Sequence, residues 1–270
     1  MVITEKEFVE LTNYIKRQYG IHMKEEKRTL LIGRLQQVLH QNNFSSFTEF
    51  IEHVKSDKTG HALVELADKI TTNHTFFMRE TNHFQFFQAY ILPELTDRLK
   101  DKDIRIWSAG CSSGQEPYTL AMILSDYYGK EKMMWNTQIL ATDISSRSLL
   151  QAASGEYPTE QIGTLPARWR ESYFKVKTPT TSVICDKLKA EVIYRKFNLM
   201  EPVFPFKKRF HVIFCRNVMI YFDNPTKEEL VDKFWDQLEY GGYLFIGHAE
   251  SLNRDKTKFR YVMPAVYRKE

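Results

Sequence analysis

Cysteine is scarce in this chain of 270 residues, because only Cys111, Cys185 and Cys215 occur and no C-x-x-C pair brings two of them together. An odd and dispersed set of cysteines argues against a disulfide scaffold and against a structural zinc site. Glycine and proline are also few, with 11 and 9 residues, while hydrophobic residues make up 43% of the chain. These proportions exclude collagen-like and disordered proteins, so we expect a globular protein with a real core.

Long hydrophobic runs are missing as well. The most apolar stretch, residues 210–222, is interrupted by Arg216 and Asn217 and is shorter than the roughly 18 residues that a membrane span needs. The first residues, MVITEKEFVE, are acidic and amphipathic, whereas a signal peptide starts with basic and then apolar residues. Because the sequence shows neither a membrane span nor a signal peptide, we expect a cytoplasmic protein. The net charge of +4 permits an acidic partner without requiring one.

The first 75 residues show helical patterns only. Thr4 and Glu7 have the spacing of a capping box and predict the start of a first helix. A second helix should follow, a third should begin at Ser46, and a fourth should cover about residues 60–70. The residues expected to face the core of this bundle are Phe8, Leu11, Ile15, Leu31, Leu35, Val38, Leu63, Leu66 and Ala67.

Basic residues gather in the same region, where six Lys or Arg between positions 16 and 34 stand against only Glu25 and Glu26. Lys27 and Arg34 are seven residues apart, which predicts that they share one helix face. A stripe of this kind can dock an acidic partner, although a solvated helix face explains it too. The candidate docking residues are Lys24, Lys27, Arg28 and Arg34.

From about residue 104 short β-rich runs alternate with helical segments, a pattern that predicts a parallel sheet with helices on both faces. The five runs are residues 104–110, 137–143, 191–197, 210–215 and 242–248. Two more runs, 260–262 and 265–268, are so close that the chain must reverse between them, so the sheet should end in an antiparallel pair. This is the order of a seven-stranded, Rossmann-like methyltransferase sheet of class I.

The helix before the last parallel strand should begin at Thr226, which stands three residues before Glu229 in capping-box spacing. It should end at Gly241 and Gly242, because glycine commonly follows the last turn of a helix.

Chemistry is expected where the parallel strands end, because ligands of such sheets bind outside the carboxyl ends of the strands. The first strand is followed by Gly110-Cys-Ser-Ser-Gly114-Gln-Glu116-Pro117. This segment does not have the three glycines of a dinucleotide fingerprint, and the carboxylate of Glu116 favours a cationic ligand over a pyrophosphate. Asp143 ends the second strand and can accept both hydroxyls of a ribose. S-adenosylmethionine, a nucleoside with a cationic end, is the candidate cofactor.

Two further segments carry polar residues that a core or a plain linker does not need. The fourth strand ends in CRNVMIYF, which places Arg216, Asn217 and Tyr221 at the same edge, although Tyr221 can also be an ordinary packed aromatic residue. The segment TTNHTFFMRE, residues 71–80, mixes hydroxyl, amide, aromatic and arginine side chains between the two predicted domains.

The strings TTNHTFFMRE, WSAGCSSGQEPYTLA, ATDIS, FNL and FCRNVMIYFD, in this order, resemble the chemotaxis receptor methyltransferases, the CheR family. The resemblance covers nearly the whole chain. It implies a protein-glutamate O-methyltransferase that uses S-adenosylmethionine, gives S-adenosylhomocysteine, and esterifies glutamates on the cytoplasmic helices of chemoreceptors. It also implies a helical docking domain at 1–75, a linker helix at 76–99, and a methyltransferase domain at 100–270 that carries a small β-subdomain at about 157–190.

The resemblance implies a set of site residues as well. The family's cofactor contacts fall on Asn73, Thr75, Arg79, Glu116, Asp143, Asn198, Leu199, Arg216 and Asn217. Its candidates for orienting the methyl group and the acceptor fall on Arg79 and Tyr221. No metal is implied, contact with a membrane is expected only through the receptors, and a monomer is expected. Nothing in residues 157–190 decides whether the insert binds a receptor tail peptide.

Two other functions use the same predicted sheet. A nucleic-acid methyltransferase could stack a base on Tyr221, but Asn217 is not followed by Pro-Pro and no long basic tract is present. A non-catalytic scaffold could keep the cofactor pocket alone. Cys111 lies near the predicted pocket, where it is either a small residue in a turn or a reactive thiol.

Overall fold

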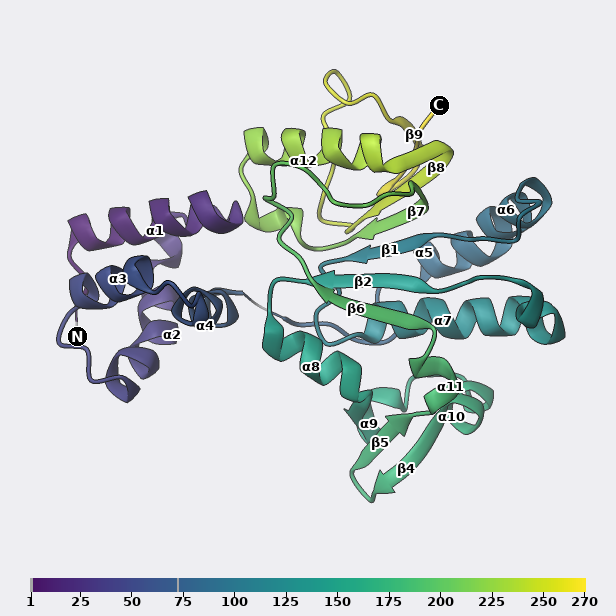
Figure 1. Cartoon of the computed structure of the whole chain (residues 1–270), viewed down its shortest axis with the longest axis horizontal. Coiled ribbons are helices and arrows are strands. Elements are labelled where there is room, and N and C mark those ends of the chain that lie inside the picture. The colour runs from purple at the N-terminus through teal and green to yellow at the C-terminus, as the bar shows by residue number, and fades with distance from the viewer. Residues whose placement is uncertain (1, 72) are drawn as a thin grey trace.

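The computed structural model describes residues 2–71 and 73–270, so that Thr72 of the junction segment lies outside the described residues. Figure 1 shows a helical bundle beside a larger domain built on a twisted sheet, with a small insert hanging from that domain. The helices of the bundle are α1 (Glu5–Tyr19), α2 (Arg28–Gln41), α3 (Phe47–Ser56) and α4 (His61–Ile70).

The local signals of the bundle act as predicted. The Thr4 side chain accepts a hydrogen bond from the backbone N–H of Glu7, and the Glu7 carboxylate accepts one from the N–H of Thr4 at 2.8 Å. Ser46 caps α3 by accepting from the N–H of Glu49 at 3.1 Å, and α1 ends at Gly20, whose φ of 70° suits glycine. The predicted core residues are buried except Leu63, which is half-buried.

The predicted position of Lys27 on the second helix is wrong. A 3₁₀ turn, η1 (Glu25–Lys27), precedes α2, and Lys27 occupies the position before its first residue. Lys27 and Arg34 therefore do not lie on one helix face. The seven-residue spacing failed because it presumes one continuous helix, whereas the chain changes conformation after Lys27.

The second domain contains a seven-stranded sheet in the order β6-β2-β1-β7-β8-β10-β9. Its strands are β1 (Ile106–Ala109), β2 (Ile139–Asp143), β6 (Val192–Lys196), β7 (Phe210–Cys215), β8 (Leu238–Ile246), β9 (Arg260–Met263) and β10 (Val266–Arg268). The first five are mutually parallel, whereas β10 is antiparallel to both of its neighbours. The predicted parallel sheet with an antiparallel end is confirmed.

Helices cover both faces of this sheet, because its strands alternate their side chains between two cores. On one face Trp107, Ile213 and Leu244 pack with Phe234 of α12 (Asn224–Gln237). On the other, apolar residues of the strands pack with α5 (Thr81–Phe86), the π-helical turn η2 (Phe87–Ile91), α6 (Leu92–Arg98), α7 (Gln115–Tyr128) and α8 (Ser146–Ser154). The predicted linker at 76–99 is thus helical from Thr81 to Arg98.

The predicted bounds of the helix before β8 are wrong. Asp223, not Thr226, caps α12, since its Oδ1 accepts from the N–H of Thr226 at 3.2 Å. The helix ends at Gln237, and Gly241 and Gly242 lie within β8. Leu238 continues the apolar spacing of the helix, but it pairs with Phe210 in the sheet, so tertiary pairing overrides the helical pattern.

A three-stranded antiparallel sheet, β3-β5-β4, forms the insert that was predicted after the second strand. Its elements are β3 (Glu156–Pro158), α9 (Thr159–Ile162), α10 (Ala167–Tyr173), β4 (Phe174–Thr178), β5 (Thr181–Ile184) and α11 (Asp186–Lys189). The insert lies at the side of the sheet domain, away from the helical bundle (Figure 1).

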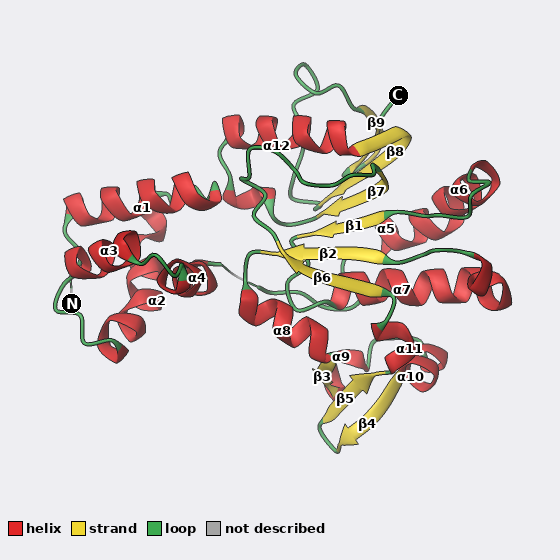
Figure 2. Cartoon of the chain, in the orientation of Figure 1, coloured by secondary structure: helices red, strands yellow, loops and turns green. Residues whose placement is uncertain are grey.

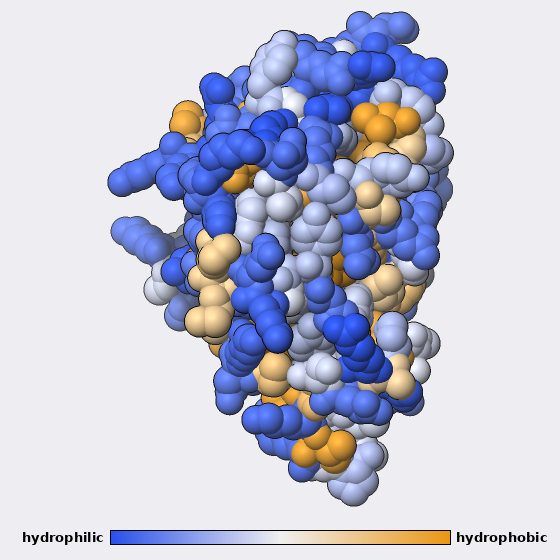
Figure 3. Space-filling model, turned by 90° about the vertical axis from the view of Figure 1, so that its right-hand side faces the viewer, coloured by the Kyte–Doolittle hydropathy of each residue, from blue (hydrophilic) through white to orange (hydrophobic). Residues whose placement is uncertain are grey.

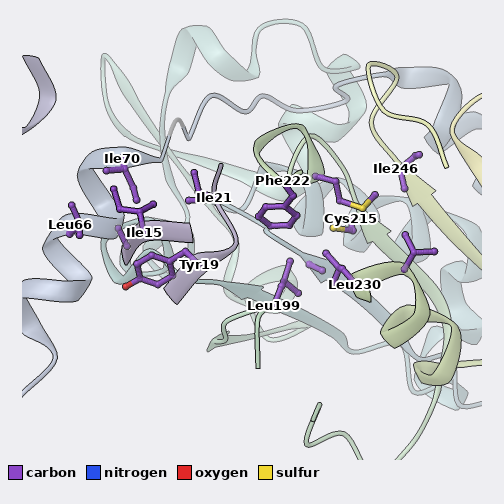
Figure 4. Packing of buried hydrophobic residues seen from close by; sticks show 14 of the residues in the cluster. Ile15, Tyr19, Ile21, Leu66, Ile70, Leu199, Cys215, Phe222, Leu230 and Ile246 are labelled. Atoms are coloured by element: carbon purple, nitrogen blue, oxygen red, sulfur yellow. The ribbon is translucent and has the colours of Figure 1, made fainter. Parts of the chain in front are cut away.

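The bundle and the sheet domain share apolar packing. Figure 4 shows Ile15 and Tyr19 of α1 on one side and Phe222 and Leu199 of the sheet domain on the other, with Ile21 between them. Ile21 also forms a β-bridge with Phe222. The two domains are therefore joined by a core as well as by the chain.

The face in Figure 3, at the end of the molecule away from the bundle, is mostly hydrophilic, and its hydrophobic areas are small and scattered. Among the described residues, no helix combines the length and the apolar character that crossing a membrane takes.

Candidate functional site

A cleft of about 280 Å³ lies between the helical bundle and the carboxyl ends of the parallel strands. The arrowheads of β1, β2 and β7 in Figure 2 point toward this side of the sheet domain. All ten cofactor and catalytic candidates line the cleft: Asn73, Thr75, Arg79, Glu116, Asp143, Asn198, Leu199, Arg216, Asn217 and Tyr221. The candidates were drawn from five separate segments, and the fold brings every one of them to a single cavity.

The turn after β1 requires its glycines. Gly110 has φ 81° and Gly114 has φ 92°, both in the left-handed region. A Cβ at Gly110 would lie 2.4 Å from Val218, and one at Gly114 would lie 2.8 Å from the Tyr194 hydroxyl oxygen. A side chain at either position would therefore clash with these neighbours as well as strain the backbone.

Asp143 is placed at the end of β2, and loop backbone holds its carboxylate. Oδ2 accepts from the N–H of Ser112 at 2.8 Å, and Oδ1 accepts from the N–H of Ser145 at 2.9 Å. Burial raises the pKa of this carboxyl, and these N–H donors oppose the effect. Asp143 also lines the cleft, and a carboxylate offers about four acceptor sites, so its oxygens can accept from ligand hydroxyls as well.

Arg216 lies at the end of β7 between two carboxylates. Its Nη1 is 3.0 Å from Oε2 of Glu116, its Nη2 is 3.0 Å from Oε2 of Glu80, and its side chain is only 2% exposed. Ser108 donates a further hydrogen bond to Glu116 at 2.7 Å. Burial raises the pKa of Glu116 although Arg216 acts in the other direction. The negative charge expected from Glu116 in the sequence is therefore not isolated but paired with Arg216.

Asn217 follows Arg216 in a left-handed conformation with φ 59°. Its backbone N–H donates to Glu250 at 3.0 Å, and its side-chain amide donates to Oε1 of Glu80 at 3.2 Å. Glu250 also accepts from the N–H of Ile220 at 3.0 Å, so one carboxylate shapes the whole turn after β7.

The junction segment forms another wall of the cleft. The Asn73 amide donates to the Ser148 hydroxyl at 2.8 Å, and the Asn73 carbonyl accepts from the hydroxyl of Ser112. Arg79 donates from Nη1 to the carbonyl of His74 at 2.8 Å, which turns its guanidinium along the segment. Thr75, between them, is half-buried.

The bundle closes the remaining side. Tyr19 and Ile21 line the cleft although they lie before residue 75. Asn198 of the sheet domain donates its amide hydrogen to the carbonyl of Gln18 at 2.7 Å and so ties the two walls together, while Leu199 is buried beside it. Neither Tyr19 nor Ile21 was a candidate in the sequence, where no pattern indicated that they reach the cofactor side.

Tyr221 lines the cleft, and a backbone contact ties it to the bundle. Its carbonyl accepts from the N–H of His22 at 2.7 Å, and the ammonium group of Lys27 lies 5.7 Å from the centre of its ring. Lys24 and Lys27 are exposed. Lys27, one of the candidate docking residues, is thus a neighbour of the candidate catalytic tyrosine.

The other two docking candidates have partners within the chain. Arg28 pairs with Glu5 at 2.6 Å and with Glu25 at 2.7 Å. Arg34 donates to the carbonyl of Ile70 at 2.7 Å, at the last turn of α4. Both residues are half-buried and stabilise the bundle, whereas Lys24 and Lys27 are exposed to solvent.

Sequence reasoning missed Glu80 and Glu250, which hold the cleft residues without lining the cleft themselves. Glu80 stands in the quoted string TTNHTFFMRE, but a carboxylate at a domain junction has no distinctive spacing. Glu250 follows β8, and the rule that strand ends carry the site could have found it. Cys111 lines the cleft but is buried, and burial raises its thiol pKa well above the usual range, which favours the unreactive turn residue.

Three potential metal ligands meet near the cleft in the described part of the chain. Side-chain atoms of Glu80, His83 and His248 lie within 4.8 Å of one another. Arg216 already lies 3.0 Å from Oε2 of Glu80, and its positive charge opposes the binding of a metal cation there. The absence of a metal stays a prediction.

Comparison with protein families agrees with this geometry. The model described as "CheR methyltransferase, SAM binding domain" matches residues 73–267, and "CheR methyltransferase, all-alpha domain" matches residues 6–71. The chain belongs to the CheR methyltransferase family. It is an S-adenosylmethionine-dependent methyltransferase of the chemotaxis group, as the strings in the sequence indicated.

Curated members of the CheR family align over almost the whole chain. The chemotaxis protein methyltransferase of Borreliella burgdorferi is 42% identical and covers 99% of this chain and 95% of that protein. Chemotaxis protein methyltransferase 1 of Pseudomonas aeruginosa is 34% identical, over 92% of this chain and 91% of that protein. The chemotaxis protein methyltransferase of Listeria monocytogenes is 33% identical with the same two coverages, 92% and 91%.

Proposed function

We propose that this chain transfers the methyl group of S-adenosylmethionine to glutamate carboxylates on chemoreceptors in the cytoplasm. The observation that carries the proposal is the meeting of all ten candidate residues in one cleft between the two domains. In this proposal residues 1–75 dock the receptor, 76–99 link the domains, and 100–270 hold the cofactor and perform the transfer. The insert at 157–190 is part of that last domain.

Three groups of the cleft fit the parts of the cofactor. The Asp143 carboxylate, which lines the cleft at the end of β2, suits the ribose hydroxyls. Glu80 and Glu116 place two carboxylates around the single guanidinium of Arg216, so this end of the cleft favours a ligand with a positive charge. Gly110 and Ser112 of the turn after β1 line the cleft, so a ligand there can approach the backbone.

The acceptor needs no catalytic base, because a glutamate with an ordinary pKa of about 4.3 is already a carboxylate near neutral pH. Bound S-adenosylmethionine supplies an electrophilic methyl group whose S–C bond breaks as the carboxylate oxygen attacks, leaving S-adenosylhomocysteine. The chain has to hold the oxygen in line and exclude water. Positioning of this kind can contribute on the order of 7 to 11 kcal/mol.

Arg79 and Tyr221 are proposed to orient the acceptor. The Arg79 guanidinium lines the cleft and can make a charge-assisted hydrogen bond to the incoming carboxylate. The Tyr221 backbone is fixed to the bundle through His22, and the residue lines the cleft. Both roles depend on contacts made when the acceptor is present.

Docking is proposed to depend on Lys24 and Lys27 more than on Arg28 and Arg34. Lys24 and Lys27 are exposed, and Lys27 lies over the ring of Tyr221, so an acidic receptor helix that contacts them is brought to the cleft. Complementary charges of this kind raise encounter rates. Arg28 and Arg34 spend their donors on contacts within the bundle.

The experiment is a transfer assay with radiolabelled S-adenosylmethionine and receptor-containing membranes, followed by mild alkali. Esters on glutamate release labelled methanol, whereas methyl groups on nitrogen stay on the product. Labelled methanol from the receptor band supports the proposal. Alkali-stable label would point to a nucleic-acid or amine acceptor, and no label despite cofactor binding would point to a scaffold.

A further inference from the structure

We propose that Glu80 is a positioning residue for the methyl-transfer site, which holds Arg216, Asn217 and the turn after β8 in the arrangement that binds S-adenosylmethionine. The inference rests on the cofactor role proposed above. Glu80 itself is not among the residues that line the cleft, so it acts through its neighbours.

The Glu80 carboxylate joins the ends of two strands. Oε2 accepts from Nε of Arg216 at 3.3 Å and from its Nη2 at 3.0 Å. Oε1 accepts from the side-chain amide of Asn217 at 3.2 Å and from the backbone N–H of His248 at 3.2 Å. Arg216 and Asn217 follow β7 and His248 follows β8, so one side chain sets the spacing of both turns.

Arg216 cannot find another orientation easily once Glu80 is present. Its guanidinium is buried between Glu80 and Glu116 and lies 5.1 Å from the centre of the Phe84 ring. Nη2 also donates to the carbonyl of Arg79. Two carboxylates, a carbonyl and a ring thus surround one cation, and Glu80 supplies two of the hydrogen bonds.

Asn217 depends on Glu80 in a different way. A left-handed φ of 59° is unusual for a residue with a side chain and persists only where the surroundings hold it. Gly247 leaves the space for the Asn217 amide, because a Cβ there would lie 2.4 Å from its nitrogen. Glu80 accepts from that same nitrogen, so it fixes the amide against Gly247.

Glu80 is itself built into position. Glu80 is the residue before α5 and has a φ of 57°, so it shares the left-handed backbone conformation of its partner Asn217. Burial acts to raise the pKa of Glu80, but the Arg216 charge and the hydrogen bonds from Asn217, Arg216 and His248 together lower it. The carboxylate therefore stays charged at neutral pH and keeps all four hydrogen bonds.

The test is calorimetric titration of the full chain with S-adenosylhomocysteine, together with KM values for S-adenosylmethionine and for receptor. We expect Glu80→Gln to weaken affinity for the product about tenfold, the lower end of the scale found when a group that orients a metal ligand is removed. KM for S-adenosylmethionine should rise and KM for receptor should not change. A purely structural role would lower the active fraction without moving either KM.

Glu94→Gln is the matched control. Glu94 also lies in the helical segment before β1 and pairs with an arginine of the sheet, Arg268, at 2.6 Å, but it does not line or adjoin the cleft. It should keep wild-type affinity. Unchanged affinity and KM in a folded Glu80→Gln variant would overturn the inference.

If Glu80→Gln does not fold, the Glu80→Asp variant tests the inference instead. Aspartate keeps the charge beside Arg216 but is about 1.5 Å shorter, so it cannot also hold Asn217 and the N–H of His248. Weaker product binding in this variant supports the inference, and wild-type binding overturns it. A wild-type chain that does not bind the product would instead overturn the cofactor role itself.

Discussion

In the helical bundle, Leu11, Ile15, Leu31 and Leu35 are completely buried and pack against one another through aliphatic groups. At the strand ends, the comparable buried position is held by Arg216, whose partners are carboxylates from distant parts of the chain. Apolar burial tolerates changes in which residues meet, because it has no direction. A buried charge is stable only with its own partners, so the cleft depends on specific pairs and the bundle on shape and volume.

The largest effect is expected from Arg216→Met, which removes the cation between Glu80 and Glu116. We expect a loss of roughly 3 to 5 kcal/mol in the free energy of unfolding, because two buried carboxylates then face each other without a counter-charge. Binding of S-adenosylhomocysteine should be lost as well. Denaturant unfolding and calorimetry measure the two effects, and a stable variant that binds the product would contradict the account of the cleft.

Leu35→Ala tests the bundle in the same terms. Its side chain is completely buried, so truncation should lower the free energy of unfolding by about 2 to 5 kcal/mol. Product affinity should stay at the wild-type value under conditions where the variant is folded. A parallel fall in affinity would mean that the bundle core and the cleft are not independent.

Acid sharpens the comparison, because the sheet domain buries histidines and the bundle exposes all of its own. Burial lowers the pKa of His211 to about 4, and the charge of Arg105 adds to this. In the unfolded chain the pKa of this histidine is near 6.5, so below that pH the unfolded chain binds more protons than the folded protein. The free energy of unfolding therefore falls as the pH drops from 7 toward 4. At pH 5 the expected loss from this residue is about 2 kcal/mol.

His211→Asn isolates that contribution. The His211 ring accepts a hydrogen bond from the N–H of Arg105 through Nδ1, and the asparagine oxygen can replace it. The stability difference between wild type and variant should shrink by about 2 kcal/mol between pH 7 and pH 5, measured by denaturant unfolding. A difference that does not depend on pH would show that folding leaves the pKa of His211 unchanged.

Tyr221→Phe should separate catalysis from cofactor binding. Loss of one hydroxyl contact to the acceptor corresponds to at most about tenfold in turnover. Affinity for S-adenosylhomocysteine should be unchanged, because the ring remains. Wild-type turnover in the transfer assay would remove Tyr221 from the mechanism.

The smallest effect is expected from reversing the two exposed charges, Lys24→Glu with Lys27→Glu. Transfer to receptor should fall severalfold at low salt, and added salt should weaken wild-type transfer in the same way. Reversal of the exposed Lys130 and Lys187, outside the bundle, is the control and should have little effect. If the two double variants behave alike, the docking role of Lys24 and Lys27 is wrong.

Much of the fold could be predicted because its signals are local. The capping box of Thr4 and Glu7 sets the start of α1 within four residues, and alternating apolar runs mark each strand. The errors also have local causes. Lys27 was placed on α2 because spacing cannot show that a 3₁₀ turn intervenes, and α12 was extended because Leu238 keeps a helical spacing while pairing in the sheet.

The candidate site could be predicted where a residue ends a strand or stands in a family string, as with Asp143 and Arg216. The residues that hold them could not. Tyr19 and Ile21 look like core residues of the bundle, and they line the cleft only because α1 ends against the sheet domain. Glu250 and Glu80 act on Asn217 from other elements, and no spacing relates the three.

The sequence alone determined where most helices occur, the succession of the strands along the chain and the identity of the groups at the strand ends, since periodicity and capping act over a few residues. Only the tertiary structure decided which of those groups are neighbours. Burying Arg216 required Glu80 and Glu116 to reach it from a domain junction and from a helix start. The physical reason is that pairing of charges acts through space, in a medium from which folding has removed the water.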